Sequence, residues 1–556
     1  MVDVLSQLIG QRKARGAFFT PPEVSRFIAD WAIRESSDRV LEPSCGDAAF
    51  LLPAADKLLA LGCNRQSIAN QIDGVDIHAA TVDEARERLA VEGFGADISV
   101  GDFFERQPRS VYDAVVGNPP FVRYQDFSGE ARAKGLRAAL AQGVRLTALA
   151  SSWAAFTIHA AEFLKDNGRL GLVLPAELLS VNYAAQVRRF LMGRFARVRL
   201  ILFEQLLFPG VLAEVVVLLA EGRGSTDTFE VHQLRDAADL AAFDVAVTRR
   251  GFVPVADEKW TPALLPSAAL EVYRDLTGGR QFNKLVNWGE VYLGAVTGNN
   301  RFFTLSAADA TLHGLAQPDL VRISPPGARH LRGLVFAEAA WREQAEAGAR
   351  CYMFSPDASE PSVAARAYIA AGERGDVQAA YKCKVRSPWW RVPLVARPDL
   401  LFTYMNHDRP RLVANLAGTE ILNSLYGVKL KPTFRTLGIS TLPIACLNTL
   451  TLLGSEIVGR AYGGGLLKHE PKEADLLPTP DPALMEAAQD DLRALSPQLS
   501  TALRQNDLGR AVDMVDAVIL ERHLALPAEH LSELRRAREG LFRRRMTRGR
   551  GENGED

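Results

Sequence analysis

The sequence has little of what marks secreted, membrane-spanning or zinc-binding proteins. Its 556 residues include five cysteines, an odd number without a CxxC pair, which predicts reduced thiols and no zinc site. No apolar run is long enough to span a bilayer, and the start, MVDVLSQLIGQRKARGAFF, has no apolar core of the kind found in signal peptides. We therefore expect a cytoplasmic protein that binds no metal.

The chain also lacks an excess of charge of either sign. Lysine and arginine total 65 and aspartate and glutamate total 66, so the formal net charge is −1. This balance excludes a uniformly cationic nucleic-acid coat, and any contact with nucleic acid must come from local basic patches. With 47% hydrophobic residues the chain can form a large packed core, and its length predicts two or three domains.

Helical and strand patterns alternate from about residue 16 to residue 222. Thr20 and Glu23 flank Pro21 as in a capping box, which predicts that a first helix begins there. Strands alternating with helices predict an α/β domain with a parallel sheet covered on both faces. The predicted strands are residues 39–42, 72–76, 98–100, 112–116, 169–174, 198–203 and 215–219.

This alternation weakens after residue 222. The following stretch is richer in proline and glycine and contains no internal repeat. From about Asp481 the pattern is helical, and it closes with the basic run of residues 543–548. We therefore predict three parts, which are an α/β domain at 1–250, a mixed domain at 251–485 and a C-terminal helical segment with a basic tail at 486–556.

The first two predicted strands each end in an acidic residue. Glu42 opens the segment EPSCGDAAF, in which Cys45 and Gly46 let the backbone approach a ligand, and the next helix offers free N–H groups to a carboxylate. Asp76 ends the second strand, where a carboxylate can accept hydrogen bonds from a ribose diol. Taken singly, each segment fits an ordinary turn or a solvated aspartate equally well.

The third strand is followed by Asp102 and Phe103. Asp102 can accept a hydrogen bond from an adenine amino group while Phe103 packs on the ring. Carboxylates after three successive strands are much less expected by chance than a single one. Because ligands of parallel sheets bind at these strand ends, the set predicts an adenosine-bearing cofactor with an amino-acid tail.

The segment Asn118-Pro119-Pro120-Phe121 follows the fourth strand. Two adjacent prolines hold a stiff, extended turn, so the Asn118 side chain and the Pro119 carbonyl can present two acceptors to one NH₂ group. The lone pair of an aromatic amine is delocalised into its ring, so the amine is a poor nucleophile. Two such acceptors favour a tetrahedral nitrogen whose lone pair points at an electrophile. Phe121 offers a flat face for a planar substrate. The alternative is an ordinary turn.

These motifs, in this order, resemble those of the γ-class adenine methyltransferases of restriction–modification systems, the TaqI-like group. The order is GAFFTP, LEPSCGDAAF, GVDIH, GDFF and GNPPF, then RLGLVLP, and then LFP before EVVVLLAE. Segments 294–303, 382–390 and 462–468 resemble the family's target-recognition region, so the likeness spans about residues 16–480. Two features depart from the commonest pattern, because Phe121 stands where many members have tyrosine and Cys45-Gly46 is not diagnostic.

The resemblance implies an S-adenosylmethionine-dependent methyltransferase, with a Rossmann-like catalytic first domain and a second domain for DNA target recognition. It implies that Asn118, Pro119 and Phe121 are catalytic, with Phe208 as a second aromatic wall for the target adenine. The cofactor contacts that it implies are Thr20, Glu42, Cys45, Gly46, Asp76, Ile77, Asp102, Phe103, Asn118 and Phe156.

The resemblance further implies methyl transfer to N6 of an adenine flipped out of double-stranded DNA. We expect a monomer associated with the bacterial nucleoid. Only about 15 residues precede the first motif, so any cognate restriction endonuclease is expected to be encoded separately. The rivals are methylation of a protein glutamine amide or of RNA adenine, and a non-catalytic DNA-specificity protein. The large second domain disfavours the glutamine enzyme, and the intact Asn118 to Phe121 segment disfavours the non-catalytic protein.

Two basic segments are candidates for DNA contact. The linker 122–150, which includes Lys134, is either a loop that touches DNA or a solvated helix. Residues 382–397 mix basic side chains with Trp389 and Trp390, a combination that suits DNA but is as often part of a core.

Overall fold

The computed structural model describes residues 20–205, 207, 214–247, 251–255, 258–357 and 359–549 of the chain. The chain divides into two compact units between Leu264 and Leu265, and the second unit continues to Met546. The helices from residue 486 onward, which the sequence pattern sets apart, belong to the second unit up to that residue.

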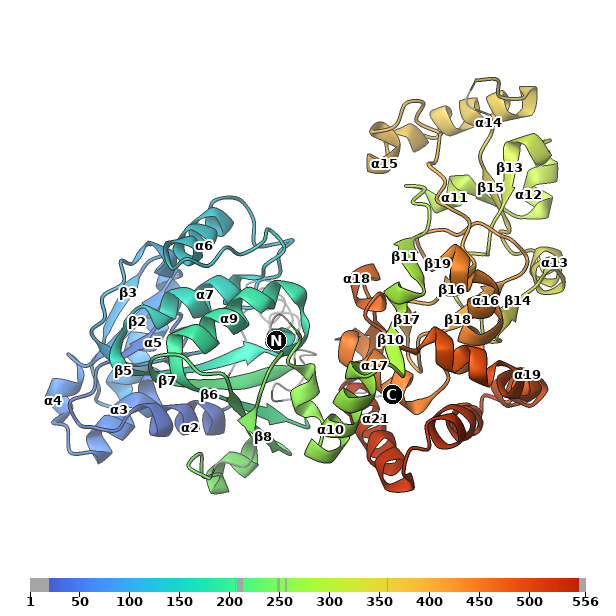
Figure 1. Ribbon diagram of the computed structural model, residues 1–556. Helices are drawn as coiled ribbons and strands as arrows, with labels where there is room; N and C mark the ends of the chain where they lie inside the picture. The colour runs from blue at the N-terminus through green and yellow to red at the C-terminus, as the bar shows by residue number, and fades with distance from the viewer. Residues whose placement is uncertain are drawn as a thin grey trace. The chain divides into compact units, whose positions relative to one another are not determined.

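In the described residues the first unit is an α/β domain on a nine-stranded sheet (Figure 1). Its strands are β1 (Val40–Glu42), β2 (Ile72–Asp76), β3 (Asp97–Val100), β4 (Tyr112–Gly117), β5 (Leu164–Pro175), β6 (Phe195–Phe203), β7 (Val215–Arg223), β8 (Phe229–Leu234) and β9 (Gly251–Phe252). Its longer helices are α2 (Pro22–Ala32), α3 (Leu51–Ala60), α5 (Ala79–Val91), α6 (Gly129–Ala141), α7 (Ser152–Ala161) and α9 (Ala185–Arg194).

The strand order is β3-β2-β1-β4-β5-β7-β6-β8-β9. The first five strands in this order run parallel, as predicted. Strand β7 is antiparallel to both β5 and β6, so the predicted parallel arrangement does not extend to this edge of the sheet. Only residues 204–214 separate β6 from β7, which is too few for the crossover that parallel neighbours need.

Helices cover both faces of this sheet, with α2, α3 and α5 on one face and α6, α7 and α9 on the other (Figure 1). The first group shares a buried cluster with the sheet that includes Ile28, Leu51 and Leu89. All ten residues of α7 are buried. Burial on both faces explains why the central strands are continuous apolar runs.

Helix α2 packs closely on the centre of the sheet. Gly171 of β5 permits this approach, because a Cβ there would lie 2.5 Å from the Cγ2 atom of Ile28. The predicted capping box is wrong, since Pro21 is the N-cap residue and no side chain caps the helix. The hydroxyl of Thr20 instead accepts a hydrogen bond from Asn118.

The second unit holds several small sheets and a group of helices. In the described residues the sheets have the orders β11-β19-β16-β18-β14, β12-β15-β13, β17-β21-β20 and β10-β22. Their strands are β10 (Phe282–Lys284), β11 (Gly289–Leu293), β12 (Thr304–Leu305), β13 (Leu320–Arg322), β14 (Val335–Phe336), β15 (Tyr352–Phe354), β16 (Leu400–Phe402), β17 (Met405–Asn406), β18 (Leu412–Asn415), β19 (Tyr426–Leu430), β20 (Arg460–Tyr462), β21 (Leu466–Lys468) and β22 (Pro478–Pro480). The main helices are α10 (Ser267–Gly278), α12 (Ala307–Leu312), α13 (Glu338–Glu346), α14 (Val363–Arg374), α16 (Arg435–Ala445), α17 (Thr449–Val458), α19 (Pro482–Arg504), α20 (Leu508–Asp516) and α21 (Ala528–Gly549).

Contacts that are distant in sequence hold the second unit together. Strand β10 pairs with β22, and Trp288 Nε1 donates a 2.9 Å hydrogen bond to the Pro480 carbonyl. Arg545 of α21 is buried, and its guanidinium lies 2.6 and 2.9 Å from the carboxylate oxygens of Glu456 on α17. Arg545 also donates a 3.0 Å hydrogen bond to the His407 carbonyl. One member of the basic run at 543–548 is therefore an interior residue.

Among the described residues, no single helix has the length and apolarity of a membrane span. One pair of helices, Pro432–Ala445 and Thr449–Val458, reaches that length and apolarity only when the two are taken together, and they are bent by 89°.

Candidate active site at the carboxyl edge of the sheet

The two predicted halves of the site meet where the strand order reverses. The chain runs from β1 outward through β2 to β3 and then returns to the other side of β1 as β4. Ligands of open α/β sheets bind outside the strand ends at such a reversal. Glu42 ends β1, and the Asn118 segment follows β4. A Cβ on Gly117 would lie 3.6 Å from the Glu42 Cγ atom, so the two strand ends are in contact.

Glu42 is a buried acid, 2% exposed, whose carboxylate accepts a 3.2 Å hydrogen bond from the backbone N–H of Leu51. Burial is the largest cause that raises the pKa of Glu42 well above 4.5, and the negative charge of Asp47 acts in the same direction. Hydrogen bonds from the start of α3 oppose this shift but do not cancel it. Glu42 therefore keeps its proton in the pH range just above 4.5.

Asp76 joins the loop after β1 to the end of β2. Its carboxylate accepts hydrogen bonds from the N–H groups of Gly46 at 3.1 Å and His78 at 2.9 Å. The Cys45 N–H donates to the Val75 carbonyl at 3.0 Å. The structure thus brings the predicted residues Cys45, Gly46 and Asp76 together, although the Cys45 thiol is buried in the core.

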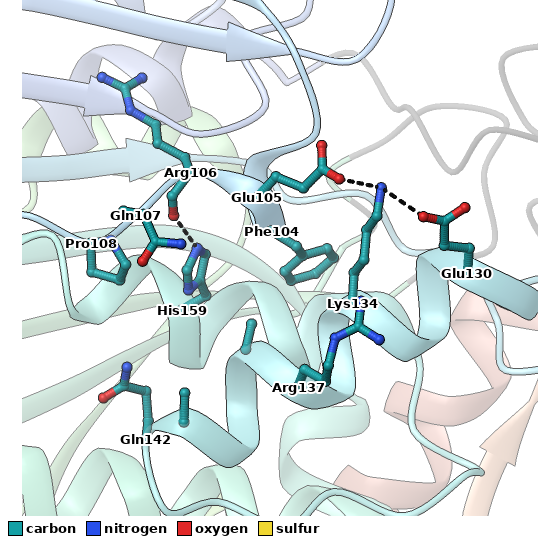
Figure 2. A pocket seen from close by; sticks show the side chains of 12 residues that line it. Phe104, Glu105, Arg106, Gln107, Pro108, Glu130, Lys134, Arg137, Gln142 and His159 are labelled. Carbon is teal, nitrogen blue, oxygen red and sulfur yellow. Dashed lines mark hydrogen bonds and ion pairs between the residues drawn. The ribbon is translucent and has the colours of Figure 1, made fainter.

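Lys134 of α6 lies among three carboxylates. Its Nζ atom is 3.3 Å from Asp102 Oδ2, 2.7 Å from Glu105 Oε1 and 3.5 Å from Glu130 Oε1. Figure 2 shows this lysine between Glu105 and Glu130 at the edge of a cavity of about 320 Å³. Residues 129–141 of the basic linker form helix α6, and Lys134 on this helix forms ion pairs within the first unit.

The aromatic side chains beside Asp102 form a buried wall. Phe103 stacks on Phe156 of α7 with ring centroids 5.3 Å apart, and the two are 3% and 9% exposed. Ile77 leaves 61% of its area in solvent directly after Asp76. An added Cβ at Gly46 or at Gly101 would meet no atom within 4 Å. Acidic groups, apolar surface and bare backbone that borders open space suit an adenosine bearing an amino acid.

His159 is a residue of this wall that sequence patterns do not reveal. Its Nε2 lies 3.1 Å from the Phe103 carbonyl and 3.2 Å from the Arg106 carbonyl, the latter contact being visible in Figure 2. Burial lowers the pKa of His159, so the ring is neutral and Nε2 carries the proton that is donated. This histidine fixes the backbone that carries Phe103.

The Asn118 segment is held from two sides. Asn118 Nδ2 donates a 3.2 Å hydrogen bond to Thr20 Oγ1, which turns the side-chain carbonyl of Asn118 away from Thr20. Pro119 is buried, and Phe121 is partly buried and packs against the cluster that contains Ile28. The predicted residues Thr20, Asn118, Pro119 and Phe121 therefore lie in one small region.

Ser152, at the start of α7, is the second support of this segment and was not predicted. Its hydroxyl accepts a 3.0 Å hydrogen bond from the Val122 N–H and donates to the Pro120 carbonyl. The Ser152 N–H donates to the Val122 carbonyl at 3.0 Å. A serine in an apolar helix gives no distinctive signal, because only the structure places it against the loop.

Phe208, the predicted second aromatic wall, lies outside the described residues. The tryptophan pair of the second unit is described and belongs to a core. Trp390 is 8% exposed, and Trp389 packs on Phe302 with ring centroids 5.6 Å apart. Of the two alternatives for this pair, the structure therefore supports the core.

The first unit has the Rossmann-like α/β fold of S-adenosylmethionine-dependent methyltransferases. Residues 4–234 match the sequence model of the N-6 DNA Methylase family, and residues 257–520 match that of the C-terminal domain of Type II methyltransferase M.Eco57I. Together these two matches and the type II methyltransferase relatives described next support an N6-adenine DNA methyltransferase of the restriction–modification type.

Individual relatives match over nearly the whole chain. Type II methyltransferase M.AccI of Acinetobacter calcoaceticus is 21% identical over 527 residues, which cover 92% of this chain and 94% of the relative. Type II methyltransferase M.XamI of Xanthomonas campestris pv. amaranthicola is 25% identical over 494 residues, covering 86% and 88%. Among solved structures, a cryo-EM structure of a DrdV–DNA complex has the same fold, with a TM-score of 0.50 at 11% identity. That match covers 88% of this chain and 57% of the other.

Proposed function

We propose that the protein transfers the methyl group of S-adenosylmethionine to N6 of an adenine in double-stranded DNA. The observation that carries this proposal is the Asn118 amide, which Thr20 orients beside Pro119 at the end of β4 and next to buried Glu42. The match of residues 4–234 to the sequence model of the N-6 DNA Methylase family supports it.

Each residue of the site has a separate task in this reaction. The cofactor supplies an electrophilic methyl group on its sulfonium. Asn118 and Pro119 offer carbonyl oxygens to the two N–H bonds of the adenine amine, which directs the nitrogen lone pair outward. Phe121 stacks on the extruded base, and Phe208 is proposed as the facing aromatic residue. No residue has to remove a proton before the transfer.

The cofactor residues are assigned in the same way. Asp76 accepts from the ribose hydroxyls, and Asp102 accepts from the adenine amine. Phe103, Phe156 and Ile77 provide apolar contacts to the adenine. Glu42, with the Cys45-Gly46 backbone and Thr20, faces the amino-acid part. Asn118 borders the methyl group.

We assign the reading of the DNA sequence to residues 265–546, the second compact unit. The match of this part to the C-terminal domain of a type II methyltransferase supports the assignment. Base edges have to be read by side chains outside the catalytic pocket, and a separate domain can supply them. A restriction endonuclease with the same target is the proposed functional partner.

The proposal is tested with radiolabelled cofactor and three substrates in parallel, which are duplex DNA, RNA and a protein with an accessible glutamine. We expect label in the DNA, and hydrolysis to nucleosides should recover it as N6-methyladenine. Label only in RNA or protein would contradict the DNA substrate. Label in cytosine would contradict the adenine assignment alone, because the same acceptors suit that amine.

Asp76→Ala is expected to weaken cofactor binding in the absence of DNA by about 1.5–3 kcal/mol, the value of a hydrogen bond to a charged group. Isothermal titration calorimetry measures this directly. Asp83→Ala, which removes an exposed carboxylate of α5 that pairs with Arg86, is the matched control and should bind normally. Equal affinities of Asp76→Ala and wild type would remove Asp76 from the cofactor site.

Cofactor binding is expected to release a proton from Glu42. The raised pKa keeps Glu42 protonated between 4.5 and its shifted value, and a bound cation favours the ionised form. Affinity for the cationic cofactor should therefore rise with pH across this window. Calorimetry in buffers of different ionisation enthalpy counts the protons, and Glu42→Gln should release none. An equal release from wild type and variant would contradict the assignment.

Ser152→Ala is expected to lower kcat by about 5- to 150-fold, because two neutral hydrogen bonds to the loop are lost at about 0.5–1.5 kcal/mol each. The KM for the cofactor should stay constant, since the Ser152 hydroxyl forms its hydrogen bonds with the loop. Ser152→Thr keeps the hydroxyl and should restore most of the rate. A variant that loses thermal stability but keeps kcat would show that Ser152 has a purely structural role.

A further inference from the structure

The second unit contains a basic cavity of about 450 Å³. Three segments of the chain line it, which are residues 328–332, residues 405–411 at and after β17, and residues 503–508 between α19 and α20. We call it the arginine pocket, after its four arginines Arg329, Arg332, Arg409 and Arg411. Its one carboxylate is that of Asp408, so cations outnumber anions among its lining residues.

Arg409 is the unusual member of this pocket. It is only 6% exposed, and its side chain has no hydrogen bond or ion pair with any residue that the structure describes. The neighbouring Asp408 forms its ion pair with Arg411 instead, whose Nη2 lies 3.0 and 3.1 Å from the two carboxylate oxygens. Burial lowers the pKa of Arg409 to about 10; the charge of Asp408 opposes this shift, and the cations Arg411 and Arg538 add to it. Arg409 is therefore still charged at neutral pH.

The backbone around Arg409 is held in place. Thr403 Oγ1 accepts from the Arg411 N–H at 2.9 Å and donates to Asn406 Oδ1 at 2.7 Å. Asn406 Nδ2 donates to the Thr403 carbonyl at 2.7 Å. On the other side, Arg545 donates to the His407 carbonyl at 3.0 Å. These hydrogen bonds fix the backbone on both sides of Arg409, so the position from which its side chain enters the pocket is set before any ligand arrives.

A buried guanidinium without a partner destabilises a folded protein, since the charge loses its water and gains no anion. Such a group is compatible with a stable fold when a ligand supplies the missing charge. The rim of the pocket offers two more cations, because Arg329 and Arg332 are exposed and pair with no described residue. A planar guanidinium matches the oxygens of a phosphate group better than any other side chain.

We propose that the arginine pocket binds a phosphate group, with Arg409 as its buried anchor and Arg329 and Arg332 as contacts at the rim. The choice of its source rests on the proposed function: the phosphate belongs to the backbone of the DNA substrate. A contact of this kind fixes the position of the duplex on the second unit without reading its sequence.

The first test uses inorganic phosphate, so it does not depend on the proposed function. Phosphate at millimolar concentration should raise the Tm of the wild-type protein above that in chloride at equal ionic strength. Arg409→Met should abolish this increase. Without phosphate its own Tm should equal or exceed that of wild type, because an unpaired buried charge has been removed. No phosphate effect on wild type, or a phosphate effect that persists in Arg409→Met, would overturn the pocket.

The second test measures the affinity for duplex DNA at several salt concentrations. Arg332→Gln should lower the slope of log K against log salt by about one and weaken binding several-fold, as expected for the loss of one phosphate contact. Arg280→Gln removes an exposed arginine outside the pocket and serves as the control. An unchanged slope in Arg332→Gln and in Arg409→Met would exclude DNA as the source and leave a free anion as the occupant. Failure of the wild-type protein to bind DNA would instead contradict the proposed function, while the phosphate test stands.

Discussion

Asn118→Ala is expected to lower the rate of methyl transfer by at least 10²- to 10³-fold, which corresponds to about 2.7–4 kcal/mol of transition-state stabilisation. In the proposed reaction the lost carbonyl acts on the reacting amine, whose bonding changes most in the transition state. Affinity for the cofactor and for DNA should therefore stay within a factor of about three of wild type. Single-turnover methylation with saturating enzyme measures the chemical step directly.

Thr20→Val provides the matched control for this variant. It removes the hydroxyl that accepts from Asn118 Nδ2 at 3.2 Å but leaves the Asn118 carbonyl in place. A loss of about 3- to 10-fold is expected, the value of one neutral hydrogen bond used for positioning. If Asn118→Ala methylates DNA as fast as Thr20→Val, then the amide is not the catalytic acceptor. If both variants lose cofactor binding, the segment serves the cofactor and not the amine.

Arg545→Met is expected to lower the free energy of unfolding of the second unit by about 3–5 kcal/mol, because it leaves the Glu456 carboxylate buried without its partner. The Arg545 and Glu456 side chains are 3% and 7% exposed. Hydrogen bonds to the His407 and Gly465 carbonyls are lost as well. Urea unfolding followed by circular dichroism measures the change as a shift of the midpoint.

Arg543→Met on the same helix is the control, since Arg543 forms an exposed i,i+4 pair with Glu539 at 3.2 Å. Its loss should cost no more than about 0.3–0.5 kcal/mol. The double variant Arg545→Met with Glu456→Met should recover much of the stability, because the unpaired charge is then gone. Equal midpoints for Arg543→Met and Arg545→Met would contradict the interior role of Arg545.

The polar residues at the strand ends could be predicted because each strand and the residue that ends or follows it are adjacent in the sequence. Glu42, Asp76 and Asn118 each follow a short apolar run, and parallel strands bring such positions to one edge. The reversed direction of β7 was missed, because its apolar run reads the same in either orientation. Helix α2 was predicted with the wrong cap, since Thr20 has a better partner in Asn118, 98 residues away.

Residues that act through distant contacts could not be predicted. Ser152 resembles any small residue of a buried helix until the loop at Pro120 and Val122 is placed against it. Arg409 and Arg545 resemble exposed basic residues, because the sequence gives no sign of their burial. Such positions depend on packing between segments, and hydrophobic periodicity carries no information about which segments meet.

The pairing of β10 with β22 has a consequence for the order of events during synthesis. These strands are separated by nearly two hundred residues, and Arg545 adds a contact between positions 456 and 545. The sheet of the first unit from β1 to β8 is complete by Leu234, so it can form on the ribosome while the second unit is still being made. The second unit cannot fold until almost the entire chain has been synthesised, so the entropic cost of closing its long loops arises late. Slow or stalled translation near the end should therefore release molecules with a folded catalytic sheet and an open second unit, which chaperones and proteases would recognise.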